Sequence, residues 1–144
     1  MKKIIILLII LLFSQSNLYA GQYSDRFANC LMQNTTERDK IVLIRWITSS
    51  ISQHPALETE FNIKSSKIKN HEIAVADYMQ YILGTVCFEE AKNVLNKEGT
   101  EAFGKAFELL GEIAMISLMN DQKVKLSLEN WVNYLDKDFI KKFE

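Results

Sequence analysis

Proline, glycine and histidine are scarce in this 144-residue chain, which has one proline, five glycines and two histidines. The glycines form neither a phosphate-binding loop nor a dinucleotide-binding fingerprint. A Gly-x-Ser-x-Gly nucleophile elbow is also missing. His71 and Glu72 begin a zincin-like signature, but Val75 stands where the second histidine ligand is required. We therefore predict no metal site, no cofactor and no set of catalytic residues.

An excess of basic charge is also lacking. Residues 21–144 contain fifteen Lys and Arg against eighteen Asp and Glu, a formal charge of −3. Nucleic-acid-binding proteins present a basic patch or stripe, and none is visible here. The composition therefore argues against a nucleic-acid partner.

The long apolar run that a membrane span requires is missing too. The longest run, Ile4–Phe13, has ten residues, whereas a span needs roughly 20. Two lysines precede this run, and the polar stretch SQSN and then LYA follow it before Gly21. This layout predicts a secretory signal peptide at 1–20, cleaved to release a periplasmic or secreted product. An uncleaved N-terminal anchor is the alternative, and only this segment is expected to meet the membrane.

Only two cysteines are present, Cys30 and Cys87. In an exported chain two cysteines usually form one disulfide. This bond would close a 57-residue loop, for which the chain-entropy model gives roughly 4 kcal/mol of stabilisation. A catalytic thiol is the alternative reading, but no histidine lies close in sequence to either cysteine.

Apolar residues recur with helical spacing, and no segment shows sustained strand alternation. Residues 21–144 are therefore predicted to form one domain, an all-α bundle of about five helices stapled by Cys30–Cys87. Ser24, Thr36, Asn70 and Thr100 are the expected N-caps of the first four helices. The expected helices cover 25–33, 37–53, 71–96, 101–118 and 128–143, with a long loop before the third.

The second predicted helix has a clear apolar side and a clear polar side. Leu43, Ile44, Ile47 and Ile51 share the apolar side, with Trp46 at its margin. Four polar residues share the opposite side and are expected to face water: Arg38, Arg45, Ser49 and Ser52. The possible partner-binding residues are basic side chains from this helix and from the following loop: Arg38, Arg45, Lys64, Lys67 and Lys69.

The third and fourth predicted helices each carry a glycine signal. The apolar face of the third changes side near Gly84, which indicates a kink or different neighbours for its two halves. In the fourth, Gly104 and Gly111 lie seven residues apart on one flank. Because glycine weakens a helix, this pair predicts that another helix approaches closely there.

Function is predicted mainly from these absences: an exported helical protein that binds another protein, as an inhibitor, immunity factor or accessory subunit. One alternative is a carrier that holds an apolar small molecule in its core, lined by Phe103, Phe107, Met115, Met119, Tyr78 and Tyr81. Another is a small carboxylate-dependent hydrolase or lyase that uses Asp77, Glu72 and His71. Asn34 begins a glycosylation sequon, which matters only in a eukaryotic source.

Overall fold

The computed structural model describes residues 21–57 and 59–143, so the predicted signal segment lies outside the described residues. Within them the protein is all-α and contains no strand, which confirms the predicted class. The helices are α2 (Gln22–Asn34), α3 (Glu37–Ile51), α4 (Ser65–Tyr81), α5 (Phe88–Lys97), α6 (Gly99–Asn120), α7 (Gln122–Glu129) and α8 (Lys137–Ile140). Single turns complete the described chain: 3-10 turns η1 (Pro55–Leu57), η3 (Asn130–Tyr134) and η4 (Lys141–Phe143), and the π turn η2 (Ile82–Val86).

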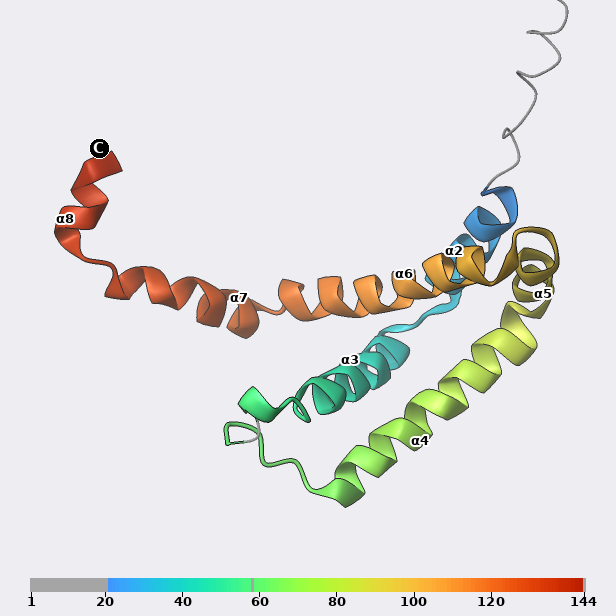
Figure 1. Ribbon diagram of the computed structural model, residues 1–144, viewed down its shortest axis with the longest axis horizontal. Helices are drawn as coiled ribbons and strands as arrows, with labels where there is room; N and C mark the ends of the chain where they lie inside the picture. Colours follow the sequence, from blue (N-terminus) through green and yellow to red (C-terminus); the bar gives the residue numbers. More distant parts are fainter. Residues whose placement is uncertain (1–20, 58, 144) are drawn as a thin grey trace, which may run out of the picture.

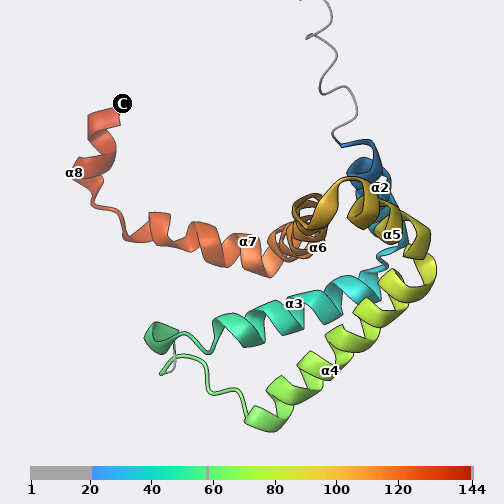
Figure 2. The ribbon, with the colours of Figure 1, turned by 45° about the vertical axis from the view of Figure 1, so that its right-hand side comes forward.

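Helices α2 to α6 form the bundle, and α7 and α8 extend away from it (Figures 1 and 2). Helices α3 and α4 pack side by side, and α6 packs against α2, α3 and α5. Helix α7 contacts α6 at their junction. The predicted fifth helix is therefore interrupted, and it does not join the bundle.

The core is built entirely from α2 to α6. Its buried apolar residues are Phe27, Leu31, Leu43, Val75, Tyr78, Ile82, Cys87, Ala91, Val94, Ala106, Leu110 and Ala114. Phe27 stacks on Phe103 with ring centroids 5.1 Å apart, which joins α2 to α6. No residue after Ala114 belongs to this core, among those described.

The predicted disulfide joins Cys30 to Cys87, with their Cα atoms 5.9 Å apart. It ties α2 to the residue that follows η2, deep in the bundle, because the Cys87 side chain is fully buried. Disulfides persist in oxidising environments and are rare in the cytosol. The bond therefore suggests an oxidising, extracytoplasmic compartment.

The change of apolar face near Gly84 comes from η2. The backbone N–H of Cys87 donates to the Ile82 carbonyl oxygen, five residues back, at 2.7 Å. Such a π turn inserts an extra residue into the helical repeat. The apolar side of α5 is therefore rotated relative to that of α4, which accounts for the change of apolar face seen in the sequence.

Helix starts were predicted less well than helix faces. Thr36 caps α3 as expected and forms a capping box with Asp39. Ser24, Asn70 and Thr100 lie inside helices instead. Helix α4 already begins at Ser65, so the predicted loop is shorter than expected.

No helix among residues 21–57 and 59–143 is both long enough and apolar enough to cross a membrane.

Candidate protein-binding surfaces

The last described segment, residues 121–143, is here called the C-terminal arm. Asp121 caps α7 by accepting from the backbone N–H groups of Lys123 and Val124. Asp136 caps α8 in the same way. The arm therefore owes its helical turns to local hydrogen bonds. Helices of this length are marginal in water without packing against a neighbour.

The arm exposes an unusual amount of apolar surface. Trp131 is 62% exposed, Tyr134 83% and Phe143 77%. The large apolar side chains exposed in the arm, among those whose exposure is described, are Leu126, Leu128, Trp131, Val132, Tyr134, Phe139 and Phe143. So many large exposed apolar side chains on one short segment make the arm a candidate binding surface.

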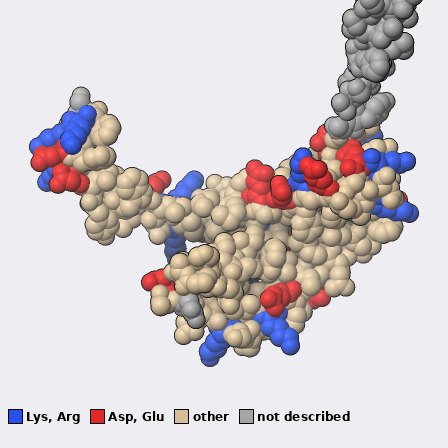
Figure 3. All heavy atoms as spheres, in the orientation of Figure 1, with Lys and Arg blue, Asp and Glu red and all other residues tan. Residues whose placement is uncertain are grey.

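The arm helix, here α7 together with the 3-10 turn η3 that directly follows it, is amphipathic. Val124 and Leu128 on α7 and Trp131 on η3 follow one another at i, i+4 and i+7, so they lie on one side of this helix. Leu126 points to the opposite side, where charged and amide side chains dominate. In the space-filling view the charged atoms gather at the tip of the arm, and its middle is largely uncharged (Figure 3).

A second apolar surface lies on the bundle, in an open groove of about 460 Å³. Its walls are mostly apolar and come from α3, α4 and α6. The residues that line this α3–α6 groove are Leu43, Trp46, Ile47, Met79, Phe103, Gly104, Phe107, Glu108, Leu110 and Gly111. A Cβ atom added at Gly104 or Gly111 would meet nothing within 4 Å. No helix of the described chain therefore approaches the two glycines, contrary to the sequence prediction.

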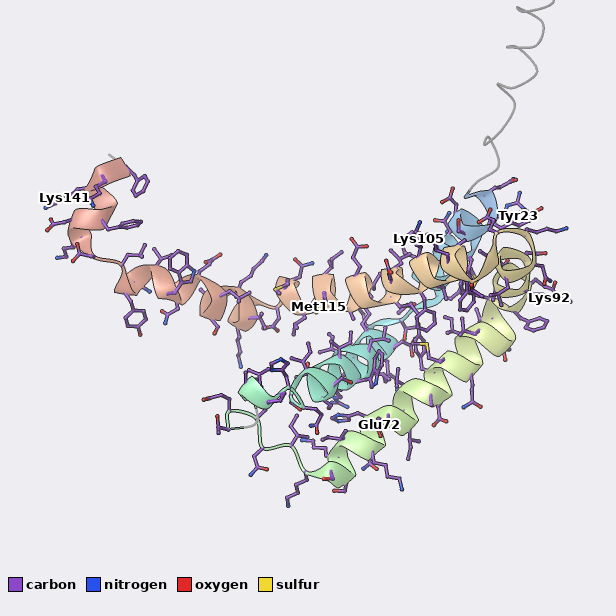
Figure 4. All side chains as sticks on the ribbon, viewed as in Figure 1. Tyr23, Glu72, Lys92, Lys105, Met115 and Lys141 are labelled. Carbon is purple, nitrogen blue, oxygen red and sulfur yellow. A yellow bond between two sulfur atoms is a disulfide. The ribbon has the colours of Figure 1, made fainter. Side chains whose placement is uncertain are left out.

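The groove and the arm are connected along α6. Gly104, Gly111, Met115 and Met119 fall within about 80° of one another on the helical wheel. Met115 and Met119 are exposed, at the end of α6 that leaves the bundle (Figure 4). A continuous strip thus runs from the groove to the start of the arm.

The predicted basic partner-binding residues are all exposed, but they do not form one cluster along the chain. Arg38 and Arg45 lie on α3, whereas Lys64, Lys67 and Lys69 lie at or near the start of α4. Their role stays a prediction. Ser49 and Ser52 were predicted to face water together with Arg38 and Arg45, but both serines are buried. The packing of α4 against α3 buries them.

Ser49 and His71 resemble a nucleophile and its base. The Ser49 hydroxyl lies 2.5 Å from Nδ1 of His71 and also donates to the Arg45 carbonyl oxygen at 2.7 Å. A hydroxyl has one proton, so if Ser49 donates it to the Arg45 carbonyl oxygen, Ser49 accepts from Nδ1–H of His71. Ser49 is also only 2% exposed, which keeps substrates away. The pair is a structural link between α3 and α4.

The other candidate catalytic residues are exposed on α4. Glu72, labelled in Figure 4, is exposed on this helix. Asp77 is also exposed, and it lies about 140° from Glu72 on the helical wheel. A pair of carboxylates that acts on one bond must converge on it, and these two diverge. Their catalytic role has no geometric support.

The residues proposed to line a carrier cavity are dispersed. Phe103 and Phe107 line the α3–α6 groove, but Met115 and Met119 lie on the exposed strip beyond it. Tyr81 is 60% exposed. The buried Tyr78 bonds Thr35 at 2.8 Å, and Thr35 in turn donates to the Leu31 carbonyl oxygen.

Burial raises the pKa of the Tyr78 hydroxyl above its ordinary value. The negative charge of Asp39 adds to the rise, and the bond to Thr35 opposes it. The neutral phenol is therefore the form that the fold stabilises.

Glu98, between α5 and α6, caps α2 across the fold. Its carboxylate accepts from the backbone N–H groups of Tyr23 at 2.8 Å, Ser24 at 2.9 Å and Gly21 at 3.3 Å. Partial desolvation raises the pKa of Glu98, but these hydrogen bonds outweigh it and hold the pKa below the ordinary carboxyl value. Gly99 follows with φ +87°, a backbone conformation that favours glycine. Sequence reasoning missed this cap because its partners lie more than 70 residues apart.

Among the residues that the structure describes, no group of three or more His, Cys, Asp and Glu side chains is placed to hold a metal ion. No protein-family model, curated protein or solved structure matches the chain. The proposal for its function therefore depends on the surfaces described above.

Proposed function

We propose that this protein acts outside the reducing cytoplasm by binding another protein, as an inhibitor, immunity factor or accessory subunit, rather than by catalysis. The observation that carries the proposal is the C-terminal arm, whose large apolar side chains are exposed and lie outside the core of the described part of the chain. The disulfide supports a location outside the reducing cytoplasm, and the predicted signal peptide would direct the export of the chain.

The chemistry of the arm favours a protein over other partners. Val124, Leu128 and Trp131 have the spacing by which an amphipathic helix docks into an apolar groove. Tryptophan and tyrosine are also the residue types most often found as energetic anchors of protein interfaces. Because the isolated arm helix is short, binding would stabilise it as well as cover it.

The experiment uses the mature chain, residues 21–144, as bait in the exported-protein fraction of the producing organism. Wild type is expected to retain a partner in stoichiometric amount, and the arm variant Trp131→Glu is expected to lose it. Leu126→Glu is the matched control, because it places the same charge on the opposite side of the same helix. Equal capture by all three baits would overturn the proposal.

A carrier function is the second candidate, supported by the α3–α6 groove. Its walls are almost entirely apolar, and its volume of about 460 Å³ lies in the range of small-molecule sites. Native mass spectrometry of freshly purified protein tests this alternative. A retained small molecule that is lost in Phe107→Glu would favour the carrier.

A further inference from the structure

We infer that the α3–α6 groove receives the C-terminal arm of a second copy, so that the free protein is an arm-exchanged dimer. This inference rests on the proposed function, since it assigns a resting partner to the same arm. Two unpartnered apolar surfaces occur in one chain, an amphipathic helix and an open groove. The helix presents an apolar side, and the groove has mostly apolar walls that such a side could cover.

The arm cannot easily reach the groove of its own chain. One residue, Asp121, separates the end of α6 at Asn120 from the start of α7 at Gln122. Antiparallel helix pairs need connections of roughly 2–5 residues. In both ribbon views the arm also leads away from the bundle (Figures 1 and 2). The occupant is therefore assigned to another molecule.

The spacing of the two surfaces matches. Val124 and Trp131 are seven residues apart, as are Gly104 and Gly111. Antiparallel pairing of two α6–α7 segments about a twofold axis near Leu118 would set Trp131 over Gly104 and Val124 over Gly111 of the second copy. The open space at both glycines would accommodate the incoming side chains.

The same arrangement covers the rest of the exposed strip on α6. Met115 and Met119 lie near the proposed twofold axis, where they would meet α6 of the second copy. One symmetric contact thus covers three surfaces that are separately exposed in the single chain: the groove, the strip and the apolar side of the arm. A twofold contact of this kind closes on itself and forms no fibre.

The charges agree with this dimer. The arm carries five lysines against four acids, a net +1, whereas residues 21–120 carry ten basic and thirteen acidic residues, a net −3. Glu108 lines the groove on α6, and the pairing sets Lys123 opposite Glu112, four residues further along the same helix.

The test is sedimentation equilibrium of the oxidised mature chain, residues 21–144, at micromolar concentration, for which a dimer mass is expected. The arm variant Leu128→Glu/Trp131→Glu should raise the dissociation constant about 100-fold or more, since it charges two anchors. The groove variant Gly104→Leu/Gly111→Leu should do the same by filling the acceptor site. Leu126→Glu should remain dimeric. Circular dichroism checks that each variant keeps its fold, as their exposed sites predict.

Mixing gives the sharpest result. The arm variant retains an intact groove and the groove variant retains an intact arm, so an equimolar mixture should form a heterodimer although neither variant dimerises alone. A monomeric wild type, a groove variant that still dimerises, or a mixture that stays monomeric would overturn the inference. Because the groove variant keeps its arm, it should still capture the partner in the bait experiment. A wild type that is monomeric yet captures that partner would refute the dimer alone.

Discussion

Removal of the disulfide is expected to cost a large part of the stability of the bundle. The double variant Cys30→Ala/Cys87→Ala opens a loop of 57 residues, which the chain-entropy model values at roughly 4 kcal/mol. Cys87 is fully buried, so its truncation to alanine adds a packing loss. A domain of this size is stable by about 5–15 kcal/mol in total. The variant should therefore unfold at a much lower denaturant concentration than wild type.

The assay is urea unfolding followed by circular dichroism at 222 nm, with wild type in oxidised and reduced forms beside the variant. The reduced wild type and the variant should both lose the loop-closure contribution, and the variant should lose more because truncation of the buried Cys87 also removes packing. A loss below about 1 kcal/mol by both routes would refute the reasoning, since it would mean that the loop is held closed without the bond. Thiol counting on the oxidised protein confirms its starting state.

Three further perturbations separate core, cap and hydrogen-bond contributions. Leu110→Ala should lower the free energy of unfolding by about 2–5 kcal/mol in urea unfolding, whereas Leu126→Ala on the exposed arm should change it by less than about 0.5 kcal/mol. The pKa of Glu98 is depressed in the folded protein, so its ionised carboxylate stabilises the fold above the ordinary carboxyl pKa. This stabilisation is lost as the pH falls through the pKa that Glu98 has in the folded protein. Thermal unfolding between pH 7 and acid should show the loss in wild type but not in Glu98→Gln. The pKa of Tyr78 is raised in the folded protein, so its neutral phenol stabilises the fold below pH 10.0. This stabilisation is lost as the pH rises through the pKa that Tyr78 has in the folded protein. Unfolding at alkaline pH should show the loss in wild type but not in Tyr78→Phe.

The sequence predicted features that depend on local periodicity or on composition. The all-α class, the Cys30–Cys87 bond and the N-cap at Thr36 follow from such signals, and the structure contains all three. These features need little knowledge of which helix lies next to which.

What depends on neighbours in space was not predictable. Ser49 is buried because α4 covers that side of α3, and Glu98 caps α2 because the fold brings distant segments together. The helical spacing of residues 128–143 predicted an amphipathic helix, but spacing does not say whether the apolar side is covered within the chain. In the described residues this apolar side is exposed, and the exposed side is the candidate binding surface.

The most direct test of the binding surface is photo-crosslinking in cells that produce the protein, with benzoylphenylalanine at position 131 and, as a control, at position 126. If the Val124–Leu128–Trp131 side of the arm contacts protein, position 131 should give defined polypeptide adducts and position 126 should not. Adducts of a second copy would identify the exchanged dimer, and adducts of another protein would identify the partner. No polypeptide adduct at position 131, or equal adducts at both positions, would contradict the account.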